Sequence, residues 1–288
     1  MVGLHYFCLT TRTRRYFNSG HSLSDQDFTE LIGNQLNLED MNVMKLIGKG
    51  YGTIVQFVQH KQTGHFFALK IIEMDIEESV HRQIEEKLRL IQSSQCPHVD
   101  YYQYFYNNGA ISIMFEYMDG GSLAELLKKV KSIPEPYLAA ICKQALKGLI
   151  SLHHKAKVIH PDIKPSKLLI NHGGEVKITD FGENTSLLSS SGRANTFVGT
   201  YSYMSPERIV VGSYDTDADI WSFSVIGSLI NYSLQKDPKK RKSGHELLVC
   251  KYISIDLWPD PNELPFVKMY DSEEVELSSY FSSALATP

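Results

Sequence analysis

The sequence has few cysteines and no metal-binding spacing among them. Its 4 cysteines, at Cys8, Cys96, Cys142 and Cys250, include no CxxC pair. This pattern argues against a disulfide framework and against a zinc site built on paired cysteines. A reducing compartment is therefore expected, namely the cytoplasm, with the nucleus as a second location.

Long apolar runs and a large excess of one charge are also absent. No uninterrupted apolar run approaches the roughly 20 residues that a membrane-spanning helix needs. The basic residues near the start follow the apolar residues 1–8, which is the wrong order for a secretory signal. A formal net charge of -4 argues against a broad nucleic-acid surface. We therefore expect a globular protein that binds neither nucleic acid nor membrane.

The residue composition and the hydrophobic periodicity of the chain change near residue 36. Residues 1–36 lack sustained periodicity and are rich in polar residues, so we expect a disordered arm. Beyond it, short apolar runs alternate with turn residues, and apolar residues at helical spacing over 76–92 predict one helix. The predicted strands, of which the last two form a hairpin, lie at 43–47, 53–60, 65–72, 99–106 and 110–117.

The pattern becomes helical after a pair of glycines, Gly120 and Gly121. Apolar residues share one face over 134–155, and a proline stands at the start of this predicted helix. The sequence therefore predicts an α+β protein with a β-rich lobe that has one helix, at 37–117, followed by a mostly helical lobe at 118–270 and a tail at 271–288.

A glycine-rich segment, GKGYG, begins at Gly48 between two predicted strands. Glycines there let backbone N–H groups approach phosphates, because no Cβ blocks them. A dinucleotide-binding fingerprint needs a helix directly after the glycines, and a Walker loop ends in Gly-Lys-Ser/Thr; the sequence has neither. The glycine-rich hairpin of kinases, GxGxxGxV, remains. Gly48, Gly50 and Val55 fit it, whereas its third glycine falls on Thr53, one residue after Gly52.

Four short motifs then occur in a fixed order along the chain. FALK at 67–70 lies on a predicted strand and resembles VAIK, and HPDIK at 160–164 follows the long predicted helix and resembles HRDLK. DFG stands at 180–182, and SPE at 205–207 occupies the place of APE. Each triplet alone is weak, but the set in this order and spacing is specific for protein kinases.

Longer stretches narrow the resemblance to the plant-type MAP kinase kinases, which are dual-specificity kinases of the STE type. The stretches that carry it are AISIMFEYMDGGSL at 110–123, KITDFG at 177–182, ANTFVGTYSYMSPER at 194–208, LQKDP at 234–238 and VELSSYF at 275–281. The resemblance runs from about Asn34 to the end. It implies a two-lobed kinase fold, ATP and Mg²⁺ as cofactors, a MAP kinase as substrate, an upstream MAP kinase kinase kinase as activator, and a monomer.

The resemblance also implies roles for individual residues. Lys70, Asp162 and Lys164 would be catalytic, and Asp180 would hold Mg²⁺. The ATP site would comprise Ile47, Gly48, Gly50, Val55, Ala68, Lys70, Glu116, Met118 and Leu169. Ser190 and Thr196 would be the phosphorylation sites of the activation loop. Supporting roles fall to Phe115 as the gatekeeper, Thr200 in the acceptor pocket, Asp219 beneath the catalytic loop, and a Glu207–Arg241 ion pair.

Three positions depart from the family pattern. Lys87 stands where a helix glutamate should pair with Lys70, and two lysines repel each other. Pro161 replaces the arginine that receives the activation-loop phosphate. Lys167 replaces the catalytic-loop asparagine, so that a metal position loses an oxygen ligand and gains an ammonium group.

The late part of the large lobe is also shortened. Trp221 and Arg241 are only 20 positions apart, and the family has further helices between them. The loss predicts exposed apolar surface in the large lobe after about residue 222.

Two functions therefore compete. One is a MAP kinase kinase with the core residues retained, and the other is a pseudokinase-like scaffold or an inactive truncated product. In addition, Arg12, Arg14 and Arg15 beside Tyr16 and Phe17 resemble a MAP kinase docking peptide, although a solvated tail is the plainer interpretation.

Overall fold

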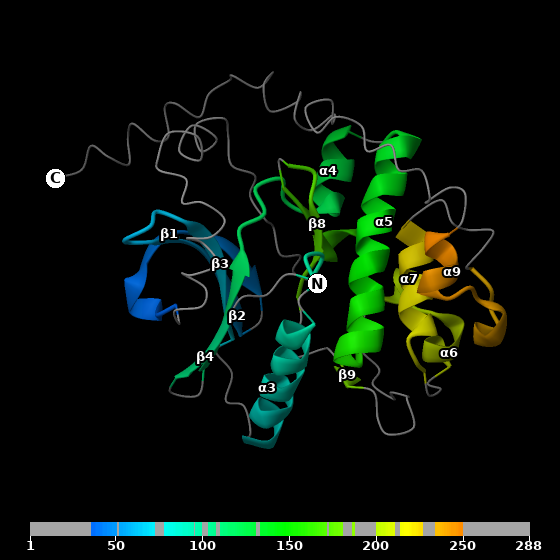
Figure 1. The fold of residues 1–288 in the computed structure, drawn as a ribbon, viewed down its shortest axis with the longest axis horizontal. Helices are drawn as coiled ribbons and strands as arrows, with labels where there is room; N and C mark the ends of the chain where they lie inside the picture. The colour runs from blue at the N-terminus through cyan, green and yellow to red at the C-terminus, as the bar shows by residue number, and fades with distance from the viewer. Residues whose placement is uncertain are drawn as a thin grey trace.

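A computed structural model of the chain describes residues 36–50, 52–72, 78–94, 96–99, 103–107, 110–130, 133–171, 173–180, 186–187, 200–210, 214–226 and 234–249. These residues form a β-rich small lobe and a mostly helical large lobe, which lie side by side in Figure 1. The predicted α+β, two-lobed fold is therefore confirmed.

The small lobe is a sheet of five antiparallel strands in the order β1-β2-β3-β5-β4. A short 3₁₀ turn, Leu38–Asp40, precedes it. The strands are β1 (Met41–Gly50), β2 (Thr53–His60), β3 (Phe66–Ile72), β4 (Gln103–Asn107) and β5 (Ala110–Glu116). The predicted strand meander is therefore confirmed, with β1 longer at both ends than the predicted 43–47.

The strand register separates the small lobe into two apolar faces. Ala68 lies opposite Phe57 on β2 and Phe115 on β5, so these side chains share the face toward the large lobe. Phe67 points to the other face, where it packs in a cluster with Leu36. Leu36 is only 3% exposed, so this last residue of the predicted arm belongs to the small lobe.

The helix α3 (Glu78–Ser93) lies between the sheet and the large lobe (Figure 1). Ile84, Leu88 and Ile91 are buried along one side of it, as their spacing predicted. Its first predicted turn, before Glu78, falls partly on residues 73–77, which lie outside the described residues.

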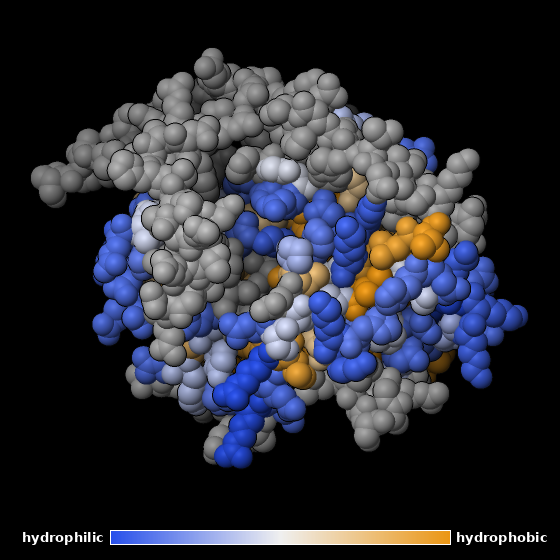
Figure 2. Space-filling model, in the orientation of Figure 1, coloured by the Kyte–Doolittle hydropathy of each residue, from blue (hydrophilic) through white to orange (hydrophobic). Residues whose placement is uncertain are grey.

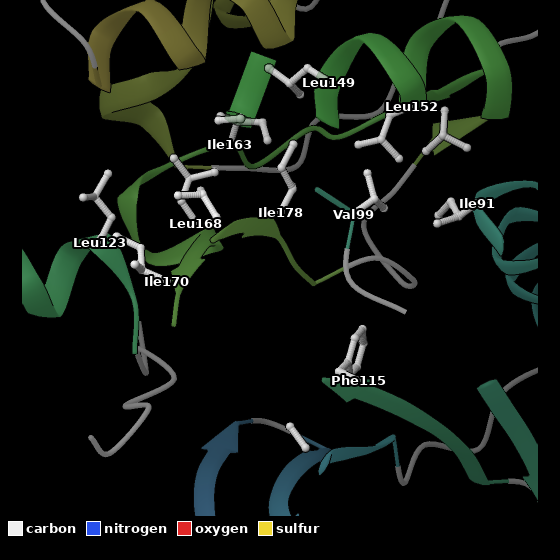
Figure 3. Packing of buried hydrophobic residues seen from close by; sticks show 14 of the residues in the cluster. Ile91, Val99, Phe115, Leu123, Leu149, Leu152, Ile163, Leu168, Ile170 and Ile178 are labelled. Carbon is white, nitrogen blue, oxygen red and sulfur yellow. The ribbon is translucent and has the colours of Figure 1, made fainter. Parts of the chain in front are cut away.

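The prediction of a strand at 99–106 was partly wrong. The strand β4 begins at Gln103, and Val99 instead forms an isolated parallel bridge with Ile178 of the large lobe. Figure 3 shows Val99 between Ile91 and Ile178. The apolar character of Val99 thus reflects burial between the lobes, which cannot be told from strand burial by sequence pattern alone.

The large lobe is built around the long helix α5 (Glu135–Ser151), which starts directly after Pro134. A π-helical turn, Leu152–Ala156, continues it, so the helix predicted at 134–155 is confirmed as two joined segments. The other helices are α4 (Leu123–Val130), α6 (Pro206–Ile209), α7 (Asp217–Ile226) and α9 (Gly244–Leu248).

Short strands and 3₁₀ turns complete the described part of the large lobe. The strands β7 (Leu168–Ile170) and β8 (Val176–Ile178) pair with each other, and β6 (Val158–Ile159) pairs with β9 (Ser186–Leu187). The 3₁₀ turns are Pro165–Lys167, Tyr201–Tyr203 and Pro238–Lys240.

The segment that joins the lobes passes very close to β7. A Cβ atom on Gly120 would lie 2.5 Å from the carbonyl oxygen of Ile170, so only glycine fits there without a backbone shift. The backbone N–H of Ile170 donates to the carbonyl of Gly121 at 2.9 Å. This contact fixes the connection between the lobes against the hairpin that precedes Asp180.

Apolar side chains are exposed on the shortened part of the large lobe, as the sequence predicted. Val225 on α7 is 37% exposed, and Val249, directly after α9, is 79% exposed. Figure 2 shows hydrophobic surface over this side of the lobe. Within the described residues, no helix is both long and apolar enough to cross a membrane.

Candidate active site

The glycine-rich segment forms the turn between β1 and β2. Gly48 and Gly50 belong to β1, Gly48 lies opposite Val55, and Tyr51 lies outside the described residues. Gly52 has a φ of 63°, a left-handed conformation that glycine adopts without strain. The early position of this glycine is therefore explained by the turn, which needs it at residue 52.

The residues predicted for the adenine pocket come from both lobes. Ile47, Val55 and Ala68 are buried in one cluster on the inner face of the sheet. Leu169 on β7 is 2% exposed and forms a bridge with Ser122. The predicted adenine-pocket residues are thus buried in both lobes.

The connection itself begins at Glu116, the last residue of β5. The carboxylate of Glu116 forms an ion pair with Lys177 of β8, which is an inter-lobe contact that the sequence did not reveal. Met118, two residues later, is 3% exposed. The backbone groups that were predicted to meet adenine therefore lie on a segment held to the large lobe.

Lys70 projects from the middle of β3 toward Asp180. It lies between Val55 and Ile113 in the register, and its Nζ is 2.5 Å from Oδ1 of Asp180. Asp180 follows β8 with a φ of 74°, a strained value for a residue with a side chain. The fold therefore brings together two predicted site residues that are 110 positions apart.

Lys167 reaches the same carboxylate from the other side. Its Nζ forms an ion pair with Oδ2 of Asp180, and the side chains of Lys167 and Asp180 are 13% and 14% exposed. Burial alone would raise the pKa of Asp180, but Lys70 and then Lys167 outweigh it and hold that pKa well below its usual range. The sequence had marked Lys167 as altered, without placing it on Asp180.

Asp162 and Lys164 form a compact group with Thr200. Lys164 Nζ lies 2.6 Å from Asp162 Oδ2 and donates to Thr200 Oγ1 at 2.7 Å. The hydroxyl of Thr200 donates to Asp162 Oδ1 at 2.7 Å. Asp162 and Thr200 had been predicted for the acceptor side of the site and Lys164 for the γ-phosphate, and the structure brings all three into contact.

Asp219 at the start of α7 supports the loop that carries Asp162. Its Oδ2 accepts from the backbone N–H of His160 at 2.8 Å and lies 2.8 Å from His153 Nε2. His160 in turn lies 2.9 Å from the carbonyl oxygen of Thr179 through its Nε2. The predicted support by Asp219 is confirmed, and the contribution of His153 was missed because it comes from the turn after α5.

The backbone carbonyl of Pro161 takes part in a buried hydrogen bond. Its carbonyl accepts from Nη1 of Arg208 at 2.6 Å, and Arg208 is 3% exposed with its guanidinium 4.7 Å from the ring centre of Tyr214. An arginine from α6 is thus hydrogen-bonded to the backbone of Pro161, the residue that replaces the arginine of the family motif. The pattern of the sequence gave no signal for this contact.

Arg241 and Glu207 form the predicted ion pair despite the shortened segment before Arg241. Nη1 and Nη2 of Arg241 lie 2.8 and 3.1 Å from the two carboxylate oxygens of Glu207. Arg241 also donates to the carbonyl of Asp217 at 2.6 Å, and its side chain is fully buried. Burial, with Asp215 nearby, raises the pKa of Asp217 to about 6.

Lys87 is buried on α3. It is 7% exposed, and burial lowers the pKa of its ammonium group. Glu85 pairs with Arg89 at 2.6 Å. The Lys70 ammonium contacts Asp180. Ser190 and Thr196, the predicted phosphorylation sites, lie outside the described residues.

Comparison with known proteins places the chain in a family. The protein kinase domain model matches residues 41–227. The chain is 52% identical to mitogen-activated protein kinase kinase SIPKK of Nicotiana tabacum over 87% of this chain and 80% of that protein. It is 45% identical to mitogen-activated protein kinase kinase 2 of Arabidopsis thaliana over 87% of this chain and 78% of that protein. The chain therefore belongs to the protein kinase family and, within it, to the plant-type MAP kinase kinases.

Proposed function

We propose that this chain phosphorylates a MAP kinase, transferring the γ-phosphoryl group of ATP to a threonine and a tyrosine of its activation loop. The observation that carries this proposal is the contact of Asp162 with Lys164 and Thr200. A carboxylate beside a lysine and a hydroxyl can orient an acceptor hydroxyl and accept its proton.

Each retained residue has a definite task in this proposal. Asp162 accepts or orients the proton of the acceptor hydroxyl, and Lys164 steadies the γ-phosphate. Lys70 holds the phosphates from the small-lobe side. ATP lies among Ile47, Gly48, Gly50, Val55, Ala68, Lys70, Glu116, Met118 and Leu169. Support comes from the burial of the apolar members of this set in the two lobes.

The metal side fits the family less well. Protein kinases use ATP with divalent metal, and two Mg²⁺ ions are held by the DFG aspartate and the catalytic-loop asparagine. Here Asp180 is the metal ligand that we propose, but both of its oxygens contact ammonium groups, and Lys167 supplies no oxygen. In the described part of the chain, no group of three or more His, Cys, Asp or Glu residues could hold a metal ion. These residues do not fit a two-metal site.

The proposals for regulation and location also rest on the likeness to MAP kinase kinases. An upstream MAP kinase kinase kinase would phosphorylate Ser190 and Thr196, and the protein would act as a monomer in the cytoplasm and also in the nucleus. The division into an arm at 1–36, lobes at 37–117 and 118–270, and a tail at 271–288 remains our prediction, as does docking through the arginines of the arm.

A transfer assay with purified protein and recombinant MAP kinases tests the proposal. The MAP kinase carries a substitution that removes its own activity, and labelled phosphate is traced to threonine and tyrosine. We expect slow transfer that Asp162→Asn abolishes. Equal signal from wild type and Asp162→Asn would show a contaminating kinase and would refute the proposal.

A second candidate is a non-catalytic MAP kinase-binding protein. The observation that favours it is the pairing of Asp180 with Lys167, because positioning and charge at this point supply most of phosphoryl-transfer catalysis. Stable binding of a MAP kinase with no transfer above the Asp162→Asn background would support this candidate. Absence of a cooperative thermal transition in the purified protein would instead support an inactive product.

A further inference from the structure

The carboxylate of Asp180 is held between two lysines from different lobes. Lys70 on β3 contacts Oδ1 of Asp180, and Lys167 on the turn Pro165–Lys167 contacts Oδ2. Two ammonium groups therefore face one carboxylate at this point. The position where the family places an oxygen ligand for metal thus carries a fixed cation.

Lys167 is held in place by its backbone as well as by Asp180. Its N–H donates to the carbonyl of Lys164 at 2.9 Å, and its carbonyl accepts from Thr179 N–H at 3.0 Å. Thr179 directly precedes Asp180 and is 2% exposed. The lysine and the carboxylate it contacts therefore lie on two segments that are hydrogen-bonded to each other.

The side chains that carry these charges are largely shielded from water. The side chains of Lys70, Lys167 and Asp180 are 9%, 13% and 14% exposed. Charges with so little contact with water are screened weakly, so they interact more strongly than they would on the surface. The asparagine that supplies an oxygen ligand for metal in the family is replaced here by a lysine, which attracts phosphate and repels a divalent cation.

We infer that Lys167 acts as a built-in cation that takes the place of one metal ion, so that the cleft binds nucleoside triphosphate without divalent metal. The inference rests on the proposed binding of ATP in this cleft and specifies how that binding is achieved. ATP without Mg²⁺ carries two more negative charges than its Mg²⁺ complex. A site with an added lysine favours this more negative form, whereas a site with asparagine needs the metal to neutralise the phosphates.

The alternative is that Lys167 only locks Asp180 and closes the cleft to nucleotide. The two alternatives differ in what happens when the lysine is replaced. A lysine that binds phosphate is needed for metal-free affinity, whereas a lysine that blocks the cleft would give higher affinity when removed.

The test is equilibrium binding of ATP, measured by calorimetry on the full-length protein in excess EDTA and in excess Mg²⁺. Wild type is compared with Lys167→Asn, with Lys167→Met, and with Lys239→Asn, which removes an exposed lysine of the turn Pro238–Lys240 as a charge-matched control. Thermal unfolding of each variant without ligand reports whether it folds.

We expect the Kd of wild type for ATP to change less than about threefold between EDTA and Mg²⁺. Lys167→Asn and Lys167→Met should bind about tenfold more weakly in EDTA, the size expected for losing one charge-assisted contact. Mg²⁺ should restore affinity in Lys167→Asn, which regains an oxygen ligand, more than in Lys167→Met. Lys239→Asn should resemble wild type.

Three outcomes would overturn the inference. They are wild type that binds only with Mg²⁺, Lys167 variants with unchanged or tighter metal-free binding, and wild type that binds in neither buffer. The proposed function is judged separately by phosphate transfer to a MAP kinase. Metal-free binding without transfer would leave this inference standing and refute the proposed function.

Discussion

The two halves of the candidate site have kept the family pattern to different degrees. The acceptor half, Asp162 with Lys164 and Thr200, has the residues that the family pattern requires, in contact at 2.6–2.7 Å. In the phosphate half, Lys70 and Asp180 are retained, but Lys167 adds a second ammonium group. The difference teaches that a kinase fold can retain the geometry for orienting an acceptor while its charge balance around the phosphates is changed.

The framework beneath the two halves differs in the same way. The acceptor half stands on buried polar contacts of the large lobe, which include Asp219 to His160 and Arg241 to Glu207. The phosphate half depends on contacts that cross between the lobes, Lys70 to Asp180 and Glu116 to Lys177. Substitutions in each half should therefore separate catalysis, stability and nucleotide binding.

The largest effect is expected at Asp162. Asp162→Asn should lower the transfer rate about a thousandfold, because the amide cannot accept the acceptor proton. The Kd for ATP should stay within about twofold of wild type, since Asp162 belongs to the acceptor half. Single-turnover transfer and calorimetry measure the two quantities. A comparable loss of ATP affinity would erase the distinction between the halves.

The second largest effect is expected on folding stability, through the buried contacts beneath the acceptor half. Arg241→Met should lower the free energy of unfolding by about 3 kcal/mol, because the carboxylate of Glu207 would remain partly buried without its partner. Denaturant unfolding measures this change. The double variant Arg241→Met/Glu207→Gln should recover part of the loss, because no charge is then left unpaired. Additive losses in the double variant would show that the two residues act independently.

A smaller effect is expected in the phosphate half. Lys167→Asn should raise the Mg²⁺-dependent transfer rate about tenfold by restoring an oxygen ligand, which corresponds to ~1.4 kcal/mol of transition-state stabilisation. The rate is measured at saturating ATP, with Lys167→Met as the control that removes the charge and adds no ligand. An equal gain in Lys167→Met would attribute the effect to charge removal alone.

The smallest expected effect is on the pH dependence of stability, through Asp217 at the start of α7. The pKa of Asp217 is raised to about 6 from its ordinary value of 3.8, first by burial and then by Asp215. The folded state therefore binds more protons than the unfolded state between these values, and stability contributed by the protonated carboxyl is lost as pH rises through this window.

Asp217→Asn should remove this loss. On raising the pH from about 4 to about 7, the variant should lose about 1 kcal/mol less stability than wild type, a figure discounted because Asp217 is half-buried. Denaturant unfolding at several pH values measures the difference, with Glu39→Gln as the control for an exposed carboxylate. Parallel pH profiles of wild type and Asp217→Asn would contradict the prediction.

Much of the fold could be predicted because local patterns determine it. A stretch rich in β-branched residues located the strand Thr53–His60 at its observed bounds, and helical spacing located α5 after Pro134. Val99 was misassigned because its burial comes from Ile178 of the other lobe. Periodicity reports that a residue is buried, but it does not report which partner buries it.

The sequence likewise predicted one part of the candidate site and gave no indication of another. The motifs supplied Lys70, Asp162, Lys164 and Asp180, and their order supplied the family. The contact between Lys167 and Asp180, the use of the Pro161 carbonyl by Arg208, and the inter-lobe pair of Glu116 and Lys177 had no signal in the spacing. Each joins segments that meet only after folding.

The sequence by itself therefore determined the residue types available for phosphoryl transfer and the lysine that replaced the catalytic-loop asparagine. Only the tertiary structure decided what that lysine does. It brings Lys167 and Lys70 to opposite oxygens of one carboxylate, and all three side chains are largely buried. Charge interactions depend on distance and on the surrounding dielectric, and both are properties of the folded chain.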